Sequence, residues 1–300
     1  MSGSCASCGV KEGEDGVNLR NCAACYRAQY CGAKCQKDHW PQHKAECKKR
    51  AAELRDEMLF KQPESTHMVD CPICFLPFPS GKLAYHTLPC CSKRICFGCQ
   101  YKNMYQEIEA MRDQKCLFCR CPLIEFEEDY IDHEKMEKLR ASRLEKNDPL
   151  ALHEEGLRHF KKGDAKTAVK YFLRAAELGD ANSHLMLAPM YRSGHGVEKD
   201  KKKDKYHLEQ AAIGGQPDAR WNLAVREFKD GHRERAVKHF IIAAKQGSDT
   251  ALDQLKNYYE FGIVSHDVFE EALRGHHAAV DATKSPQRDE AQAIAKMLNL

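Results

Sequence analysis

Apolar residues in the carboxyl-terminal half of the chain recur with the spacing of an α-helix. The clearest run is Ala168, Tyr171, Phe172, Ala175 and Ala176, at positions i, i+3, i+4, i+7 and i+8. Side chains with this spacing share one face of a helix, so the run predicts an amphipathic helix with one buried face. Most of the same face returns 68 residues later. The pattern therefore indicates a repeated helical unit.

Three short segments of similar composition define the length of this unit. They are AAELG at 175–179, AAIGG at 211–215 and AAKQG at 243–247, and successive segments lie 36 and 32 residues apart. These intervals are typical of repeats made of two helices, which stack so that each repeat buries the apolar face of its neighbour. The sequence therefore predicts an all-α helix-pair solenoid over residues 148–282.

A loop in the longest unit points to a repeat family. Residues 193–200 read SGHGVEKD, and this loop, with Leu187, Ala188 and Tyr191 before it, resembles the Sel-one-like repeats, relatives of the tetratricopeptide repeat. The resemblance implies a solenoid that binds another protein, whose identity the sequence leaves open. Pro189 departs from the family pattern. Because a proline inside a helix removes a backbone hydrogen bond, we expect it to bend the chain there.

Two further helices are predicted outside the repeats. Residues 125–146 are acidic first and basic last and contain no proline or glycine, as expected for a helix whose charges complement its dipole. We expect this segment to connect the repeats to the module before them. Residues 285–300 are expected to form a capping helix that covers the exposed face of the last repeat.

Cysteine separates the chain into two halves, because all 16 cysteines lie at or before Cys121. Most of them form C-x-x-C pairs, which in a reducing compartment are more often metal ligands than disulfides. The first residues contain no apolar stretch that reads as a secretory signal, and no run of about 18 apolar residues predicts a membrane span. We therefore expect zinc, a location in the cytoplasm or nucleus, and no membrane association.

The first cysteine-rich module, residues 5–47, contains enough ligands for two tetrahedral zinc sites, with no cysteine left over. A segment of this length cannot bury enough apolar surface to fold alone, so zinc is expected to take the place of a core. The ligands are Cys5, Cys8, Cys22, Cys25, Cys31, Cys35, His43 and Cys47.

Residues 30–47, YCGAKCQKDHWPQHKAEC, resemble the end of a MYND zinc finger, and the C-x-x-C pairs before them fit the same family. The resemblance implies that the first and third pairs of ligands share one ion and the second and fourth pairs share the other. It also implies a proline-containing peptide as partner, with Trp40 stacked on the proline and Gln36 bonded to the peptide backbone. Alternatively, Trp40 packs over the second zinc site. His39 is expected at the surface.

A helix and linker are predicted at residues 48–67, and a second cysteine-rich module follows at residues 71–121. Its ligands come as a pair, a central doublet and two more pairs, an order that resembles a RING domain. The resemblance implies two more zinc ions, about four in all. One ion would be held by the pair before the doublet and the pair directly after it, and the other by the doublet and the last pair. The expected ligands are Cys71, Cys74, Cys90, Cys91, Cys96, Cys99, Cys116 and Cys119.

The central doublet leaves an alternative open. RING domains usually carry a histidine at this point, where this chain has Lys93, and a protonated lysine cannot bind zinc. We therefore assign both Cys90 and Cys91 as ligands. The alternative is that His86 or Cys121 replaces one of these two cysteines. Cys121 is expected to be the spare cysteine.

The RING resemblance implies a ubiquitin ligase, which positions a conjugating enzyme and its ubiquitin thioester without using a nucleophile of its own. Three residues match positions that bear on this activity. Ile73 would contact the conjugating enzyme, Arg120 would link both partners, and Pro122 lies close after the last ligands. Leu117 stands where the family commonly has a proline. A RING-shaped module that binds a protein and transfers nothing is the alternative.

Charge and motifs narrow the function further. The chain has 47 Lys and Arg against 44 Asp and Glu, and its formal charge of +3 becomes −4 when fifteen thiolates and four Zn²⁺ are counted. Nucleic acid is therefore an improbable partner. No P-loop, dinucleotide-binding glycine pattern, nucleophile elbow or HExxH motif occurs.

We therefore expect a multidomain protein with two small zinc-stabilised modules followed by an all-α solenoid. Two functions follow from that expectation. The first is a ubiquitin ligase whose MYND finger and repeats select the substrate. The second is an adaptor that binds proteins and catalyses nothing.

Overall fold

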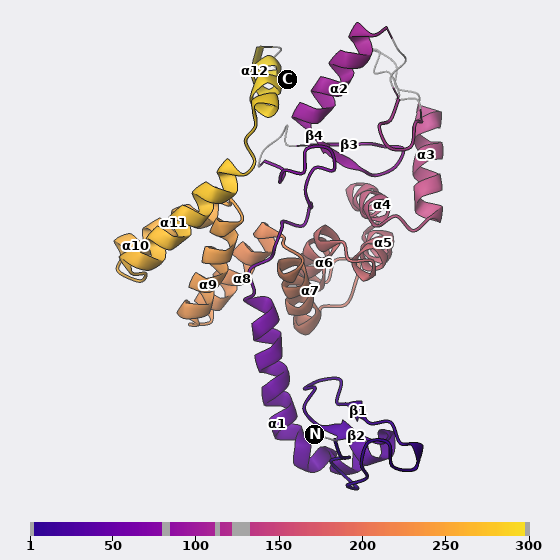
Figure 1. The fold of residues 1–300 in the computed structure, drawn as a ribbon, viewed down its shortest axis with the longest axis vertical. Coiled ribbons are helices and arrows are strands. Elements are labelled where there is room, and N and C mark those ends of the chain that lie inside the picture. Colours follow the sequence, from indigo (N-terminus) through magenta and orange to yellow (C-terminus); the bar gives the residue numbers. More distant parts are fainter. Residues whose placement is uncertain (1–2, 80–84, 112–114, 122–132, 298–300) are drawn as a thin grey trace. The chain divides into compact units, whose positions relative to one another are not determined.

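The computed structural model describes residues 3–79, 85–111, 115–121 and 133–297 (Figure 1). It divides into two compact units, Met1–Lys61 and Gln62–Leu300. Pro122 and the first part of the predicted connecting helix, residues 125–132, lie outside the described residues.

The first unit combines a small hairpin with one long helix. Its elements are a 3-10 turn at Glu14–Gly16, β1 (Arg20–Asn21), β2 (Gln29–Tyr30) and α1 (Ala33–Leu59). β1 and β2 are antiparallel. The buried cluster of this unit consists of cysteines and Tyr30, so very little apolar surface holds it together. α1 continues beyond Cys47, and the helix predicted after the finger is the second half of α1.

The second unit begins with the second cysteine-rich module. Its elements are β3 (Tyr85–Thr87), β4 (Arg94–Cys96) and α2 (Phe97–Glu109). The strands form an antiparallel hairpin in which His86 pairs with Ile95. α2 begins directly after β4, where the Cys96 side chain accepts a hydrogen bond from the Cys99 amide. The core contains Phe78, Leu88 and Ile95 among its cysteines, so this module also has few apolar side chains.

A solenoid of helix pairs makes up the rest of the second unit, and α4 with α5, α6 with α7 and α8 with α9 pack most closely. The helices are α3 (His133–Glu145), α4 (Pro149–Lys161), α5 (Ala165–Glu177), α6 (Ala181–Ser193), α7 (Lys201–Ile213), α8 (Pro217–Lys229), α9 (Arg233–Lys245), α10 (Asp249–Glu260) and α11 (His266–Asp281). The apolar face predicted from Ala168 to Ala176 is confirmed, because its alanines and Phe172 are buried in α5.

Local chemistry fixes where these helices begin and end. Asp148, Asp164, Asp180 and Asp200 each accept a backbone hydrogen bond in the first turn of the helix that follows, where N–H groups have no partner within the helix. α6 ends at Gly194, whose φ of 80° is a left-handed conformation that glycine adopts at low cost. α6 continues through Pro189 to Ser193, so the proline does not end the helix.

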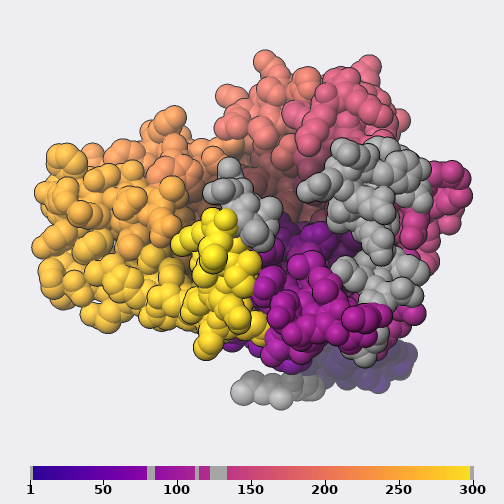
Figure 2. All heavy atoms as spheres, turned by 90° about the horizontal axis from the view of Figure 1, so that it is seen from above, coloured from indigo at the N-terminus to yellow at the C-terminus, as the bar shows by residue number. Residues whose placement is uncertain are grey.

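The last helix, α12 (Pro286–Met297), packs against α2. In Figure 2 its yellow atoms lie against the purple atoms of the cysteine-rich module. We expected residues 285–300 to cover the last repeat, and the structure instead places Pro286–Met297 on the zinc module. Small residues explain the difference, because Ala291 and Ala295 are buried on α12 and Gly98 at the start of α2 lets the two helices approach closely.

Candidate metal centres

The first metal centre gathers four cysteines from three parts of the first unit. The sulfurs of Cys5, Cys8, Cys31 and Cys35 lie within 4.8 Å of one another. Cys31 Sγ is 3.6 Å from Cys8 Sγ and 3.5 Å from Cys35 Sγ. Zinc–sulfur bonds of about 2.3 Å in a tetrahedron place sulfurs about 3.8 Å apart. The cluster therefore fits one zinc ion.

The second centre lies beside it and is completely buried. It joins Cys22 and Cys25 to His43 and Cys47, which lie one turn apart on α1. Cys22 Sγ is 3.7 Å from Cys47 Sγ, and Cys25 Sγ is 3.4 Å from His43 Nε2. His43 therefore presents Nε2 as its ligand atom. The two sets interleave as the MYND resemblance implies.

The two residues expected to bind a peptide lie at the rim of this second centre. Gln36 Nε2 is 4.0 Å from Cys22 Sγ, which places the amide beside a metal ligand. Trp40 contacts His43 edge to face at 6.4 Å between ring centroids and is still 39% exposed. It thus packs on the zinc site and is also partly open to a ligand. His39 bonds to the Tyr30 hydroxyl at 3.1 Å and is not among the ligands.

The second module gathers two further four-cysteine clusters. Cys71 and Cys74 join Cys96 and Cys99, with 3.8 Å between the sulfurs of Cys74 and Cys96. The doublet joins the last pair, with 3.7 Å from Cys91 to Cys116 and 3.4 Å from Cys90 to Cys119. These spacings also suit tetrahedral zinc.

The structure places both cysteines of the doublet in this last cluster and neither of the alternative ligands. His86 lies in the middle of β3, and burial lowers the pKa of its ring. The Cys121 carbonyl accepts a hydrogen bond from the Cys116 amide, while its sulfur lies outside the cluster.

The four C-x-x-C pairs that lie on turns share one backbone geometry. The residue after the second cysteine is left-handed at Gly9, Tyr26, Phe75 and Arg120. Its amide donates to the carbonyl of the first cysteine at 2.8–3.0 Å. This turn points both sulfurs to the same side, and glycine is the residue that adopts it without strain. Three of the four positions nevertheless carry large side chains.

Hydrogen bonding favours the thiolate form of one cysteine in each of two clusters, and a thiolate attracts a cation. Burial raises the pKa of Cys5, but backbone hydrogen bonds from Cys8 and Cys31 outweigh it and lower that pKa to about 6. At Cys71 the hydrogen bond from the Cys96 thiol is the largest cause, and the pKa falls to about 4. These groups are thiolates at neutral pH and are ready to bind metal.

The residues expected to touch a conjugating enzyme lie on the turns of the second module. Ile73 lies inside the first pair and is 38% exposed, and Arg120 is exposed directly after the last pair. Sequence reasoning did not single out Phe75 and Phe118, which are exposed aromatic residues on the same two turns. The sequence could have indicated them, because Phe118 lies inside a C-x-x-C pair and Phe75 directly follows one.

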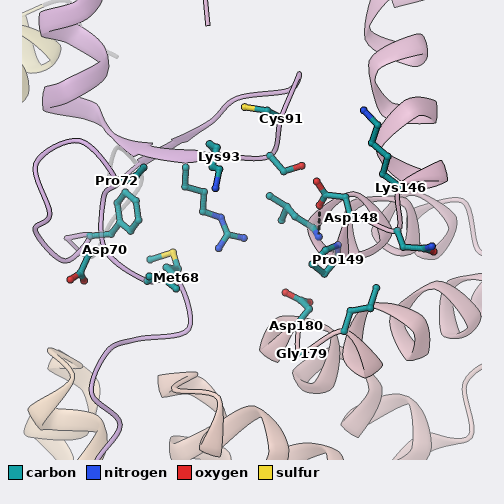
Figure 3. Close-up of a pocket in the computed structure, with 17 residues that line it drawn as sticks. Met68, Asp70, Pro72, Cys91, Lys93, Lys146, Asp148, Pro149, Gly179 and Asp180 are labelled. Atoms are coloured by element: carbon teal, nitrogen blue, oxygen red, sulfur yellow. Dashed lines mark hydrogen bonds between the residues drawn. The ribbon is translucent and has the colours of Figure 1, made fainter. Parts of the chain in front are cut away.

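A cavity of about 690 Å³ lies between the second module and the first repeats (Figure 3). Lys93 and Lys146 bring positive charge to it. Asp148 and Asp180 also line it, but both carboxylates accept hydrogen bonds at helix starts. No sequence pattern pointed to this cavity.

Comparison with known protein families agrees with the geometry of the first unit. The MYND finger model matches residues 5–47, which hold both interleaved sets of ligands. Residues 5–47 form a MYND finger. The Sel1 repeat model matches residues 150–180, 181–216 and 217–248, so helices α4 to α9 are three Sel1 repeats. With its MYND finger and four clusters, the chain is a zinc protein with about four sites. Its MYND finger and Sel1 repeats are protein-interaction modules.

Individual relatives cover limited parts of the chain. Over 30 residues it is 60% identical to the histone-lysine N-methyltransferase SMYD3 of Homo sapiens, a stretch that is 10% of this chain and 7% of that protein. A Sel1 repeat protein from Oxalobacter formigenes is similar over 56% of this chain and 80% of its own, at 22% identity and a TM-score of 0.41. A protective antigen of uropathogenic Escherichia coli with an SLR fold is similar over 56% of this chain and 36% of its own, at 20% identity and a TM-score of 0.38.

Within the described part of the chain, none of the helices combines the length and the apolar character needed to cross a membrane.

Proposed function

We propose that the protein is a RING-type ubiquitin ligase whose MYND finger and Sel1 repeats select the protein substrate. One observation carries the proposal. The second module interleaves its clusters: the pairs before and directly after the doublet form one, and the doublet and the last pair form the other. This is the arrangement that the RING resemblance implies.

The exposed side chains on the turns form the surface that would bind the conjugating enzyme. Ile73 offers an apolar contact for the conjugating enzyme, and Arg120 offers a cation close to the last zinc ligands. Phe118, 37% exposed, extends the apolar area on the last pair. In this mechanism the module holds the ubiquitin thioester in a reactive orientation, and no side chain of the module forms a covalent bond.

An autoubiquitination assay with a panel of conjugating enzymes tests the proposal. We expect a ubiquitin ladder with at least one enzyme and its loss in Ile73→Ala, with the zinc content unchanged by native mass spectrometry. Ile263→Ala is the matched control, because Ile263 is also 38% exposed but lies in the repeats. Absence of a ladder with every enzyme, from fully zinc-loaded protein, would refute ligase activity.

An adaptor without activity is the second candidate, because a peptide site at the exposed Trp40 requires no ligase activity. A ring that rests on one zinc ligand and stays partly exposed can stack on a proline. Trp40→Ala should weaken the binding of a labelled proline-containing peptide, measured by fluorescence anisotropy, with zinc retained. Equal binding by the variant and the parent would remove Trp40 from the peptide site.

A further inference from the structure

The carboxyl-terminal helix inserts an arginine into the second zinc module. Arg288, on α12, is only 8% exposed. Its Nη1 donates to the carbonyls of Pro77 at 2.6 Å and Thr283 at 2.7 Å. Its Nη2 donates to the Leu76 carbonyl at 3.1 Å and to Cys74 Sγ at 3.3 Å. A cation from the end of the chain therefore bonds directly to a metal ligand 214 residues earlier.

The backbone around Arg288 is fitted to this position. A Cβ atom at Gly98 would lie 3.0 Å from the Arg288 Cα and 3.1 Å from its backbone nitrogen, so a larger residue would push α12 away by a few tenths of an ångström. Gln287 Nε2 donates to the Gly98 carbonyl at 2.9 Å. Ala291 and Ala295 continue the buried face of α12. The contact is thus a packed interface and not one side chain reaching across solvent.

The charge of the metal site explains what the arginine does there. Four thiolates and one Zn²⁺ carry a net formal charge of about −2, which is costly to bury without a compensating cation. A guanidinium bonded to a ligand sulfur offsets part of this charge. The carbonyls of Pro77, Thr283 and Leu76 accept the other hydrogen bonds of Nη1 and Nη2 and hold the guanidinium in this orientation.

We propose that Arg288 is an outer-shell cation of the zinc site formed by Cys71, Cys74, Cys96 and Cys99. By this contact α12 is part of the second zinc module, although the repeats separate the two in sequence. Replacing a residue that orients a metal ligand typically costs 10- to 100-fold in metal affinity. The inference depends on the zinc site and is independent of ligase activity.

Zinc transfer from the full-length, zinc-loaded protein to a chromogenic chelator tests this role. In Arg288→Gln we expect one of about four zinc ions to leave at least about 10-fold faster than in the parent. Arg288→Lys keeps the charge without the forked geometry and should be intermediate. Lys296→Gln, which removes an exposed cation from the same helix, and Gln287→Ala, which removes only the Gly98 hydrogen bond, are the controls.

Two further measurements separate the role of the charge from general unfolding. Fluorescence of Trp221, measured in a Trp40→Phe background, reports whether the repeats stay folded, and hydrogen exchange of α12 reports whether it stays docked. Faster zinc loss in Arg288→Gln with folded repeats, partly restored in Arg288→Lys, supports the proposal. Parent-like zinc release in both Arg288 variants would overturn it. Equal acceleration in Lys296→Gln would also overturn it, because the effect would then be one of net charge.

Discussion

Replacing Gly156 by alanine should destabilise the first helix pair, although alanine is the better helix former. Gly156 lies in α4, where a Cβ atom would come within 2.6 Å of one ring carbon of Phe172 and 2.7 Å of another. Carbon atoms pack at about 3.5–4.0 Å, so the ring or the helix would have to move by about an ångström. Phe172 is completely buried in the cluster of the first repeats, which leaves the ring little room.

Gly275 in α11 provides a matched control for the magnitude. Its Cβ would also meet a carbon atom at 2.6 Å, but that atom belongs to Lys245, a flexible side chain that is 28% exposed and can turn away. Both substitutions gain about 1 kcal/mol of helix propensity. Overpacking a buried ring costs about 1–3 kcal/mol. We therefore expect Gly156→Ala to be about 1–3 kcal/mol less stable than Gly275→Ala.

Urea unfolding of the zinc-loaded chain, followed by far-ultraviolet circular dichroism, measures this difference. Adding Phe172→Leu should recover part of it, because the double variant reproduces the Ala188 and Leu208 pair found at the eighth residues of α6 and α7. If Gly156→Ala proved as stable as Gly275→Ala, the close approach of α4 and α5 would not be what selects glycine.

Two further predictions concern the repeats and the spare cysteine. Burial, with His184 and Lys203 adding to it, lowers the pKa of His207 to about 4, whereas an unfolded histidine titrates near 6.5. The contribution of His207 to the free energy of unfolding should therefore be fully present above about pH 6.5. It should fall by about 1.4 kcal/mol per pH unit as the pH drops to about 4. His207→Gln should lack this part of the slope when unfolding is followed by Trp221 fluorescence in a Trp40→Phe background, and an unchanged slope would contradict the reasoning. Cys121→Ser should keep the parent number of zinc ions by native mass spectrometry, whereas Cys116→Ser should lose one, and loss of zinc from Cys121→Ser would contradict the assignment.

The short-range features could be predicted from sequence because their causes are local. A C-x-x-C pair closes a turn whose amide returns to the first cysteine, as from Tyr26 to Cys22 and from Phe75 to Cys71, so the spacing alone indicates ligands on one side of a turn. The helix period around Phe172 likewise reports which face is buried. The family matches confirm the MYND finger and the Sel1 repeats.

The long-range features could not be predicted because no local pattern encodes them. α12 reads as an ordinary amphipathic helix, and its apolar face would suit the last repeat or the zinc module equally well. The position of α12 is decided by the fit of Arg288 to Cys74 and of Gly98 to the α12 backbone. These contacts depend on where the folded repeats place the last helix. The cavity beside Lys93 and Lys146 arises in the same way, from surfaces of two modules that no single motif contains.

The position of α12 also links the repeats to the zinc module energetically. Closing a loop costs more as the loop lengthens, so a contact between residues 214 positions apart would be expensive if the chain between them were disordered. The repeats remove most of that cost, because their helices pack on near neighbours in sequence and hold the chain in a defined path up to α11. Zinc binding at Cys71 to Cys99 needs only a short loop and can precede this step. Docking of α12 then requires folded repeats, so a substitution that unfolds them should also expose the buried side of the zinc site to chelators.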